Sequence, residues 1–270
     1  MRDALSGGSV RRAGWLEWIG WLALLAGLAI GGLALAAPVG VWLGWWGFQQ
    51  GFQLLFNVAS PWGNVVAIAA AAVGVALLVL GRLLGAQGGL KAAGLAFVGA
   101  LAAWMGHAVP ESYRPGEEIP PIHDISTDTD DPPQFVAVLP LRADAANTVE
   151  YGRSEGMTPE ELASLTRMAY PDLETATLAM PPEEAFARAL NAVDALGWDL
   201  VAQAPQDGRI EATDTTFWFR FKDDIVIRIR PAAGGGAEVD ARSVSRVGRG
   251  DAGTNARRLR AFFEALDEER

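Results

Sequence analysis

The 270-residue chain contains no cysteine and only two histidines, His107 and His123. The absence of cysteine excludes disulfide frameworks, thiolate nucleophiles and cysteine-liganded metal sites. The scarcity of histidine leaves His123 as the one candidate imidazole base outside the predicted membrane spans. Catalytic chemistry therefore has few possible centres in this sequence.

Charged residues are absent from Trp18 to Gly81. An uncharged run of this length is too long for one membrane-spanning helix and fits two spans with a connection. A third apolar stretch follows, so residues 1–109 are predicted to form a transmembrane region. We expect its three spans at about 18–37, 64–84 and 90–109.

Basic residues flank the predicted spans on one side only. Arg11 and Arg12 precede the first span, and Arg82 and Lys91 lie between the second and third, whereas residues 38–63 carry no basic residue. The positive-inside rule places the N-terminus and the loop between Arg82 and Lys91 in the cytoplasm. Three crossings then place the rest of the chain on the opposite side, which is the periplasm in a bacterial inner membrane.

Residues 42–57 carry a polar stripe of Gln49, Gln50, Gln53 and Asn57 opposite a row of aromatic side chains. This pattern predicts a helix lying in the membrane interface. The alternative is a fourth span, which would place the soluble domain in the cytoplasm, against the charge rule.

The first span contains a motif that resembles a cleavage site and a pair of glycines with helix-packing spacing, and each has two interpretations. Residues 34–36, Ala-Leu-Ala, resemble a signal-peptide cleavage site, but the following Pro38 favours an uncleaved span, and the sequence leaves cleavage open. Gly27 and Gly31 have the spacing of a helix-packing motif. Packing within the chain is favoured over pairing with another protein.

Residues 110–134 contain six prolines and predict an acidic linker with little helix or sheet. Inside it, His123 and Asp124 begin a motif of unknown role. One alternative is a general base role for His123. Another is a metal site built from five side chains: His123, Asp124, Asp128, Asp130 and Asp131. We favour a linker pinned to the domain by hydrogen bonds, because the spacing of a calcium-binding EF-hand fails, and we expect no metal ion and no cofactor.

Acidic residues dominate the chain beyond residue 109. The first 109 residues hold 5 of the 22 basic and 2 of the 32 acidic residues, which leaves 17 basic and 30 acidic residues and a net charge of −13. This charge argues against nucleic acid as a partner and against general adhesion to anionic lipid.

Residues 135–270 are predicted to form an α+β domain in the order helix, antiparallel β-meander, helix. Thr158 and Glu161 have the form of a capping box for a short helix to about Met168. A second helix begins at Pro182 and ends before Gly197.

The hydrophobic period then changes to two, which predicts strands at 199–203, 209–214, 217–222, 225–230 and 238–245. Asp223 and Asp224 are expected to form a tight turn between two of them. A last helix, from about Thr254 to Leu266, should bury Ala256, Leu259, Phe263 and Leu266. Two helices should cover one face of the sheet.

Six segments resemble, in this order, the domain of unknown function 1499 family. They are IPPIHDISTD, TDDPP, YPD, IEATDTT, FKDDIVIRI and DARSVSRVGRGDAGTNARRLRAF. The resemblance covers roughly Ile119 to Leu266. It implies a soluble domain attached to N-terminal spans, and it carries over no activity and no catalytic residue.

Six arginines lie between Val239 and Leu266 in this acidic region. On the predicted last strand, Asp240, Arg242, Val244 and Arg246 share one face, because successive side chains of a strand alternate. The opposite face is small and should pack on the helices, so the arginine face is expected to be the more open one.

Three interpretations of these arginines remain open. They form a structural network with Asp240, Asp251 and the acidic linker, which we favour, or an anion site at the N-terminus of the last helix. The third is a hydrolase with Ser243 or Ser245 as nucleophile and His123 as base, although no nucleophile elbow is present. The candidate anion-binding residues are Arg242, Arg246, Arg249, Gly253, Thr254 and Asn255.

Together these observations predict a multi-pass inner-membrane protein whose periplasmic domain binds a ligand or partner without catalysis. The expected partners are the lipid bilayer and either an anionic envelope ligand or another membrane protein, and no nucleic acid. The alternatives are an envelope hydrolase that uses His123 and a structural subunit of a membrane complex.

Overall fold

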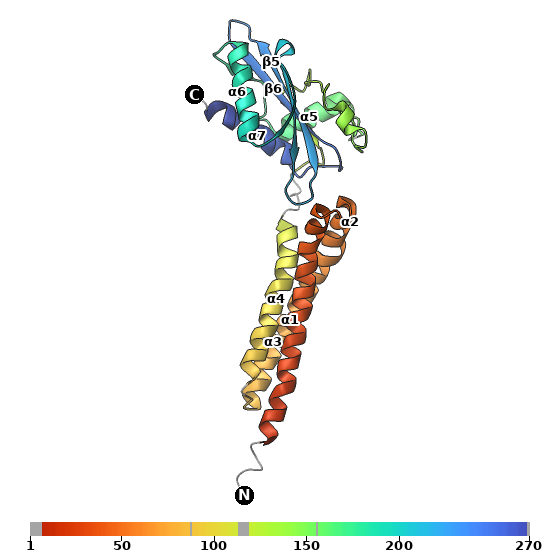
Figure 1. Cartoon of the computed structure of the whole chain (residues 1–270), viewed down its shortest axis with the longest axis vertical. Coiled ribbons are helices and arrows are strands. Elements are labelled where there is room, and N and C mark those ends of the chain that lie inside the picture. Colours follow the sequence, from red (N-terminus) through yellow and green to blue (C-terminus); the bar gives the residue numbers. More distant parts are fainter. Residues whose placement is uncertain (1–6, 87, 113–118, 155, 269–270) are drawn as a thin grey trace. The chain divides into compact units, whose positions relative to one another are not determined.

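The computed structural model describes residues 7–86, 88–112, 119–154 and 156–268 (Figure 1). Its internal contacts divide the chain into two compact units, Met1–Arg114 and Pro115–Arg270. The first unit is a helical bundle and the second contains a sheet with helices. The predicted combination of an apolar helical region and an α+β domain is therefore confirmed.

Three long helices build the bundle: α1 (Gly7–Trp42), α3 (Ser60–Leu83) and α4 (Gly89–Ser112). Two short elements, α2 (Phe48–Gln53) and the π-helical η1 (Leu54–Ala59), lead into α3 without a break. Three stretches are long and apolar enough to cross a membrane: Gly14–Trp42, Phe48–Leu83 and Gly89–Ser112.

Residues 42–57, predicted to form a separate interfacial helix, do not form one continuous element in the structure. Trp42 ends α1, whereas Phe48 begins a helix that continues to Leu83. The wider π-helical turn of η1 ends two residues before Pro61, whose ring and missing N–H would interrupt an ordinary α-helix. Residues 48–57 are therefore the beginning of the second candidate span.

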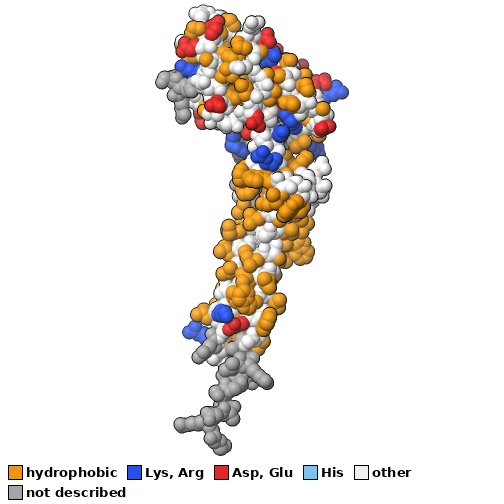
Figure 2. Space-filling view, viewed as in Figure 1, with side chains coloured by type: hydrophobic (Ala, Val, Ile, Leu, Met, Phe, Trp, Pro, Cys, Tyr) orange, Lys and Arg blue, Asp and Glu red, His pale blue; other side chains and the backbone are white. Residues whose placement is uncertain are grey.

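Glycine and alanine line the contacts between α1 and α4. A Cβ atom on Gly27 would lie 2.0 Å from the carbonyl oxygen of Gly99, and one on Gly31 would lie 2.6 Å from that of Ala102. Both glycines therefore pack within the chain, as the favoured interpretation expects. Large apolar side chains face outward instead and give the bundle its orange surface in Figure 2. Small residues inside and large apolar residues outside are typical of helices packed in a membrane.

A six-stranded antiparallel sheet forms the centre of the soluble unit. The strand order is β1-β6-β5-β4-β3, and β2 pairs with the same edge of β6 as β1 does. The strands are β1 (Asp124–Ser126), β2 (Ala176–Leu178), β3 (Asp199–Ala204), β4 (Arg209–Thr215), β5 (Lys222–Pro231) and β6 (Ala237–Ser245). The helices are α5 (Pro159–Ala169), α6 (Pro182–Ala195) and α7 (Thr254–Glu268), with short 3-10 turns η2 (Leu139–Arg142) and η3 (Pro205–Asp207).

Alternation along the central strands gives the sheet one apolar face. Ile225, Ile227 and Ile229 of β5 lie on this face together with Val239 and Ala241 of β6. Helices α6 and α7 cover it (Figure 1), as expected from the sequence. On α7 the fully buried aromatic residue is Phe262 rather than the predicted Phe263, because the buried stripe advances by three residues from Ala256 and Leu259.

The predicted strand over 217–222 is wrong, because β4 ends at Thr215 and β5 begins at Lys222. The residues between them form a loop, in which Arg220 adopts a left-handed backbone with φ 56°. Asp223 and Asp224 do not form a turn but lie buried within β5. Arginine partners from distant segments compensate their charges, so the carboxylates are tolerated inside the sheet.

The other face of the sheet, predicted to be the more open one, is covered by residues 133–149. The buried carboxylate of Glu211 in β4 accepts hydrogen bonds from the backbone N–H groups of residues 136–138. Phe135 and Val138 pack against Val244 of β6 on the same face. This segment has little secondary structure of its own, so its covering role could not be read from periodicity.

The predicted linker contributes to both units. Helix α4 continues to Ser112, and β1 joins the sheet by pairing Asp124 with Val244 of β6. Residues 110–112 and 124–126 therefore have regular structure where we expected little helix or sheet. The physical reason for β1 is that Asp124 has a buried partner in the sheet.

Candidate functional site

Arg242, the central arginine of the segment singled out above, is fully buried on β6. Its guanidinium donates to both carboxylate oxygens of Asp124, at 2.9 and 2.7 Å. It also donates to the carbonyl oxygens of Pro133 at 3.1 Å and Val149 at 2.7 Å. Two aromatic rings lie 5.4 and 5.2 Å from its central carbon, those of Phe135 and Tyr151. This arginine is therefore bound by internal groups on several sides.

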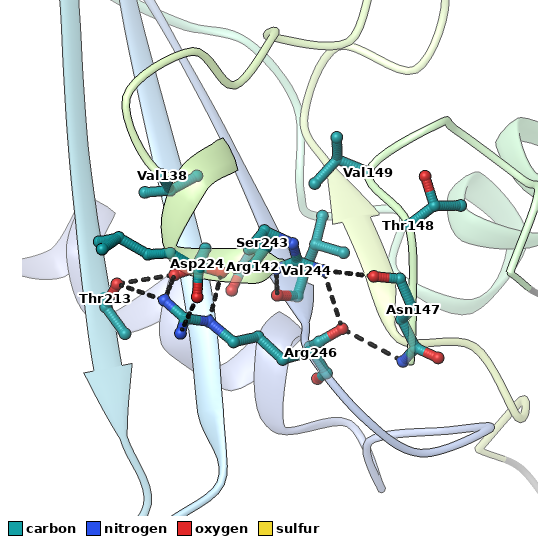
Figure 3. A network of polar contacts seen from close by, with 12 residues as sticks. Val138, Arg142, Asn147, Thr148, Val149, Thr213, Asp224, Ser243, Val244 and Arg246 are labelled. Atoms are coloured by element: carbon teal, nitrogen blue, oxygen red, sulfur yellow. Dashed lines mark hydrogen bonds and ion pairs between the residues drawn. The ribbon is translucent and has the colours of Figure 1, made fainter. Parts of the chain in front are cut away.

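Asp224 of β5 holds two further arginines, and Figure 3 shows both side chains converging on its carboxylate. Arg142 donates to Oδ2 at 2.5 Å, and Arg246 donates to Oδ2 at 2.9 Å and to Oδ1 at 2.8 Å. The Thr213 hydroxyl donates to Oδ1 at 2.6 Å. Burial alone would raise the pKa of Asp224, but the hydrogen bonds from Arg246, Thr213 and Arg142 outweigh it and hold the pKa below its ordinary value.

The N-terminus of α7, where an anion site was one of the three interpretations, is occupied by the carboxylate of Asp251. Its oxygens accept hydrogen bonds from the backbone N–H groups of Gly253 at 2.8 Å and Asn255 at 2.7 Å. Gly253 has a left-handed backbone, with φ 73°, as the chain turns into the helix. Burial raises the pKa of Asp251 above its ordinary value, and the two backbone hydrogen bonds only partly oppose this. The free N–H groups of a helix N-terminus here already have an internal anion.

The six candidate anion-binding residues therefore lie in three different places. Arg242 and Arg246 lie on the covered face of the sheet, paired with carboxylates. Gly253, Thr254 and Asn255 surround Asp251 at the beginning of α7, where the Thr254 hydroxyl also accepts from Arg257 at 3.0 Å. Arg249 lies in the exposed turn that joins β6 to α7. Of the three candidate arginines, it is the one with an exposed side chain.

Asn255 joins the two serines that were considered as nucleophiles. The Ser243 hydroxyl donates to Asn255 Oδ1 at 2.6 Å, and Asn255 Nδ2 donates to the Ser245 hydroxyl at 2.9 Å and to the backbone oxygen of His123 at 2.8 Å. Arg258 donates to Asn255 Oδ1 and, at 3.3 Å, to the Ser243 hydroxyl. Both hydroxyls are buried and held by an amide and a guanidinium group, whereas an activated nucleophile needs a general base as its partner.

His123 and Asp124 are both buried. The backbone oxygen of His123 accepts hydrogen bonds from the N–H of Ser245 at 3.2 Å and from the Asn255 amide. Asp124 pairs with Arg242. This placement agrees with a segment pinned to the domain by hydrogen bonds.

The later carboxylates of the same motif are bound to arginines rather than to one another. Asp128 pairs with Arg228 at 2.8 Å and Arg230 at 3.4 Å, and Asp131 pairs with Arg228 at 2.9 Å. Asp240 holds the same two arginines, each at 3.0 Å. Among the residues that the structure describes, no three His, Asp or Glu side chains are grouped so that they could hold a metal ion.

A cleft of about 380 Å³ opens beside this motif, between residues 127–130 and 170–175. Tyr170 lines the cleft, and its hydroxyl is buried without a hydrogen-bond partner among the described residues. Burial raises the pKa of Tyr170 above its ordinary value. Arg167, also in the lining, donates to Thr129 at 2.5 Å and to Asp130 at 3.1 Å. The lining is mostly polar, so a ligand in this cleft would be hydrophilic.

Sequence reasoning missed several members of the buried network, among them Arg142, Asp223, Asp224 and Arg258. Arg258 donates to Asp223 at 2.7 Å and to Asp214 at 2.8 Å, and it joins α7 to the sheet. The available signal was the pair of aspartates directly before the alternating isoleucines of β5. Charged residues at that position of a strand require buried partners of opposite charge.

A comparison with protein families matches residues 124–266 to the family described as "Protein of unknown function (DUF1499)". The match includes all six strands, and it covers more than half of the chain. No curated protein matches the chain significantly.

Proposed function

The chain belongs to the family of proteins of unknown function DUF1499, and on this premise we propose that it is a bacterial inner-membrane protein whose soluble unit lies in the periplasm and binds without catalysis. The three candidate spans support the membrane part. Arg82 and Lys91, on either side of the turn between α3 and α4, support a cytoplasmic position of that turn. An odd number of spans then places the soluble unit on the outer side.

The main support for a non-catalytic role is the burial and hydrogen bonding of the Ser243 hydroxyl. Its hydroxyl is buried and donates to Asn255, and it accepts from Arg258. A serine in this arrangement stabilises the contact between β6 and α7 and is not poised to attack a substrate. The soluble unit therefore acts through its surface, on an anionic envelope ligand or on a protein partner.

The side of the membrane can be tested cleanly because the chain lacks cysteine. Leu84→Cys places a thiol in the exposed turn between α3 and α4, and Ala233→Cys places one in the exposed turn between β5 and β6. A membrane-impermeant maleimide added to intact spheroplasts should label Ala233→Cys and leave Leu84→Cys unlabelled. Lysis should make both thiols reactive. Labelling of Leu84→Cys alone before lysis would place the soluble unit in the cytoplasm.

The hydrolase alternative is tested with a fluorophosphonate probe, which reacts with activated serines. The full-length protein in detergent should stay unlabelled, because Ser243 and Ser245 are buried and bound to Asn255. Stoichiometric labelling that Ser243→Ala or Ser245→Ala removes, without a change in thermal stability, would replace the binding role by hydrolysis.

A further inference from the structure

The loop between β4 and β5, residues 216–221, presents two large aromatic side chains on the surface of the soluble unit. Phe217 is 62% exposed and Trp218 is 45% exposed, and their rings meet edge to face at 5.1 Å. Phe219 is buried and stacks on Phe221, which anchors the loop. Two hydrogen bonds between Thr216 and Phe221, at 2.8 and 2.9 Å, close its base. We call residues 216–221 the aromatic loop.

Exposed basic residues lie at the same end of the sheet as the aromatic loop. Arg220 is in the loop, Lys222 begins β5, and Arg249 follows the end of β6. Leu141, which is exposed, is fixed there because its backbone oxygen accepts from Arg246 at 2.7 Å. Two carboxylates belong to the same part of the structure: Asp144 is exposed and follows Leu141 by three residues, and Asp214 of β4 is 31% exposed and pairs with Arg258. Since charges beyond about 8 Å are screened at physiological salt, we expect the three exposed cations to act on an anionic surface independently of distant acidic residues.

The strand register places the aromatic loop at the end of the sheet where the chain arrives from the bundle. Asp124 of β1 pairs with Val244 of β6, Val244 pairs with Asp224 of β5, and Asp224 pairs with Thr213 of β4. These four residues form one row across the sheet. The chain enters β1 just before this row, and β4 runs past it into the aromatic loop. Three strand spacings, about 15 Å, separate the two positions.

The connection to the bundle is short. Helix α4 ends at Ser112 and β1 begins at Asp124, so the intervening chain can reach at most about 40 Å when fully extended. The length of this segment therefore limits how far β1, and with it this end of the sheet, can lie from the end of α4. Aromatic side chains favour the lipid–water interface, and basic side chains favour anionic headgroups.

We propose that Phe217 and Trp218 insert into the lipid–water interface of the membrane that the bundle crosses, while Arg220, Lys222 and Arg249 bind anionic lipid headgroups. The exposed aromatic pair, the local cations and the short tether at the same end of the sheet together support this partner. The inference rests on the membrane-bound character in the proposed function but not on the periplasmic side. It gives the exposed Arg249, a candidate anion-binding residue, a lipid phosphate as its ligand.

The test uses the full-length protein in nanodiscs of phosphatidylcholine and phosphatidylglycerol that contain doxyl-labelled lipid. An environment-sensitive fluorophore on Phe217→Cys should shift its emission to the blue and be quenched by the doxyl lipid. The matched control is Ala233→Cys, at the opposite end of β5 and about 30 Å away along the strand. Its fluorophore should be neither shifted nor quenched. Leu141→Cys gives a second probe of the same end of the sheet if the loop variant unfolds.

The outcomes separate the possible occupants of the loop surface. Quenching of both probes at the loop end, and not of the control, supports insertion. A blue-shifted but unquenched fluorophore means that protein covers the loop, and it overturns the proposal, as does a fluorophore that behaves like the control. Nanodiscs have no cellular compartments, so a negative quenching result does not bear on the periplasmic position of the soluble unit. Conversely, the maleimide labelling result does not bear on the insertion of the aromatic loop.

The contribution of anionic headgroups to the contact is tested by comparing two lipid compositions. The triple variant Arg220→Gln/Lys222→Gln/Arg249→Gln should lose quenching in nanodiscs with phosphatidylglycerol and change little in nanodiscs of phosphatidylcholine alone. Equal quenching of the wild-type loop in both lipids would overturn the role of the cations. Loss of quenching in the triple variant in both lipids would also contradict a charge-specific contact.

Discussion

Buried aspartates on the covered face of the sheet determine where this protein tolerates a change of charge. Asp124 and Asp224 each neutralise at least one arginine that is removed from water. A buried pair contributes little relative to a well-packed apolar pair, but removal of one partner leaves an uncompensated charge. The variants with the largest expected effect therefore change one carboxylate and keep its shape.

Asp124→Asn should destabilise the soluble unit by about 3–5 kcal/mol, because Arg242 stays buried without a counter-charge. Hydrogen–deuterium exchange of the full-length protein should show faster exchange in β1 and β6. Asp130→Asn is the matched control, since Asp130 pairs only at the surface with Arg167, and it should cost less than about 0.5 kcal/mol. Equal protection of β6 in the two variants would contradict the role assigned to the Asp124–Arg242 pair.

Asp224 makes stability depend on pH in one direction. Its pKa in the folded state lies below the ordinary value, so its ionised form contributes stability above the unfolded pKa of about 3.9. That contribution is lost as the pH falls through the lower folded pKa. Asp224→Asn should therefore be less stable at neutral pH and should depend less on pH below about 4. Thermal unfolding midpoints across the acidic range provide the measurement.

Asp251 is the control for this titration because burial shifts its pKa upward. A carboxyl group with a raised folded pKa reduces stability as the pH rises through its unfolded pKa. Asp251→Asn should therefore not reduce the sensitivity of the protein to acid. A flatter acid profile in Asp251→Asn than in Asp224→Asn would contradict the assignment of the acid-sensitive group.

At the scale of elements, periodicity predicted strands where one face packs on helices. The isoleucines of β5 alternate as expected, and the capping box at Thr158 and Glu161 begins α5 as expected. The aromatic loop was mistaken for a strand because its phenylalanines alternate in the sequence with Trp218, Arg220 and Lys222. In the structure only Phe219 of the first three aromatic residues is buried, so the alternation of residue types does not correspond to two faces of a strand.

The candidate site was predictable only in part. The sequence placed Arg242 and Arg246 on one face of the last strand, and the structure confirms that shared face. Their partners lie about a hundred residues away, as in the bond from Arg242 to Pro133, or on a strand whose beginning was read as a turn. Contacts of such sequence separation leave no periodic signal, so the cover over the arginine face was missed.

The contact between α1 and α4 gives an element-scale prediction for the bundle. Gly27→Ala should destabilise it by about 1–3 kcal/mol, because the added methyl group would overlap the Gly99 backbone. Gly32→Ala on the same helix is the control, since nothing lies within 4 Å of the added carbon. It should be neutral or slightly stabilising, because alanine has the higher helix propensity. Thermal unfolding in detergent micelles measures both, and equal midpoints would contradict the close approach of the two helices.

At the scale of the whole molecule, two units with separate cores share one short connection. The bundle core consists of small residues with Leu16 and Leu77, whereas the soluble core gathers aliphatic and aromatic side chains around the sheet. A change in one core therefore should not alter the stability of the other. If the aromatic loop inserts into the membrane as proposed, the length of the connection sets how often the loop meets the lipid.

Insertion of about 20 Gly/Ser residues directly after Ser112 should weaken the lipid contact of the aromatic loop, because the effective concentration of a tethered group falls as a flexible linker lengthens. The doxyl quenching of Phe217→Cys in nanodiscs should decrease, while the thermal unfolding of the soluble unit stays unchanged. The same insertion after Gly234, in the exposed turn between β5 and β6, should leave quenching unaltered. Undiminished quenching after the first insertion would mean that the loop holds the membrane by its own affinity, and that the tether adds nothing to the contact.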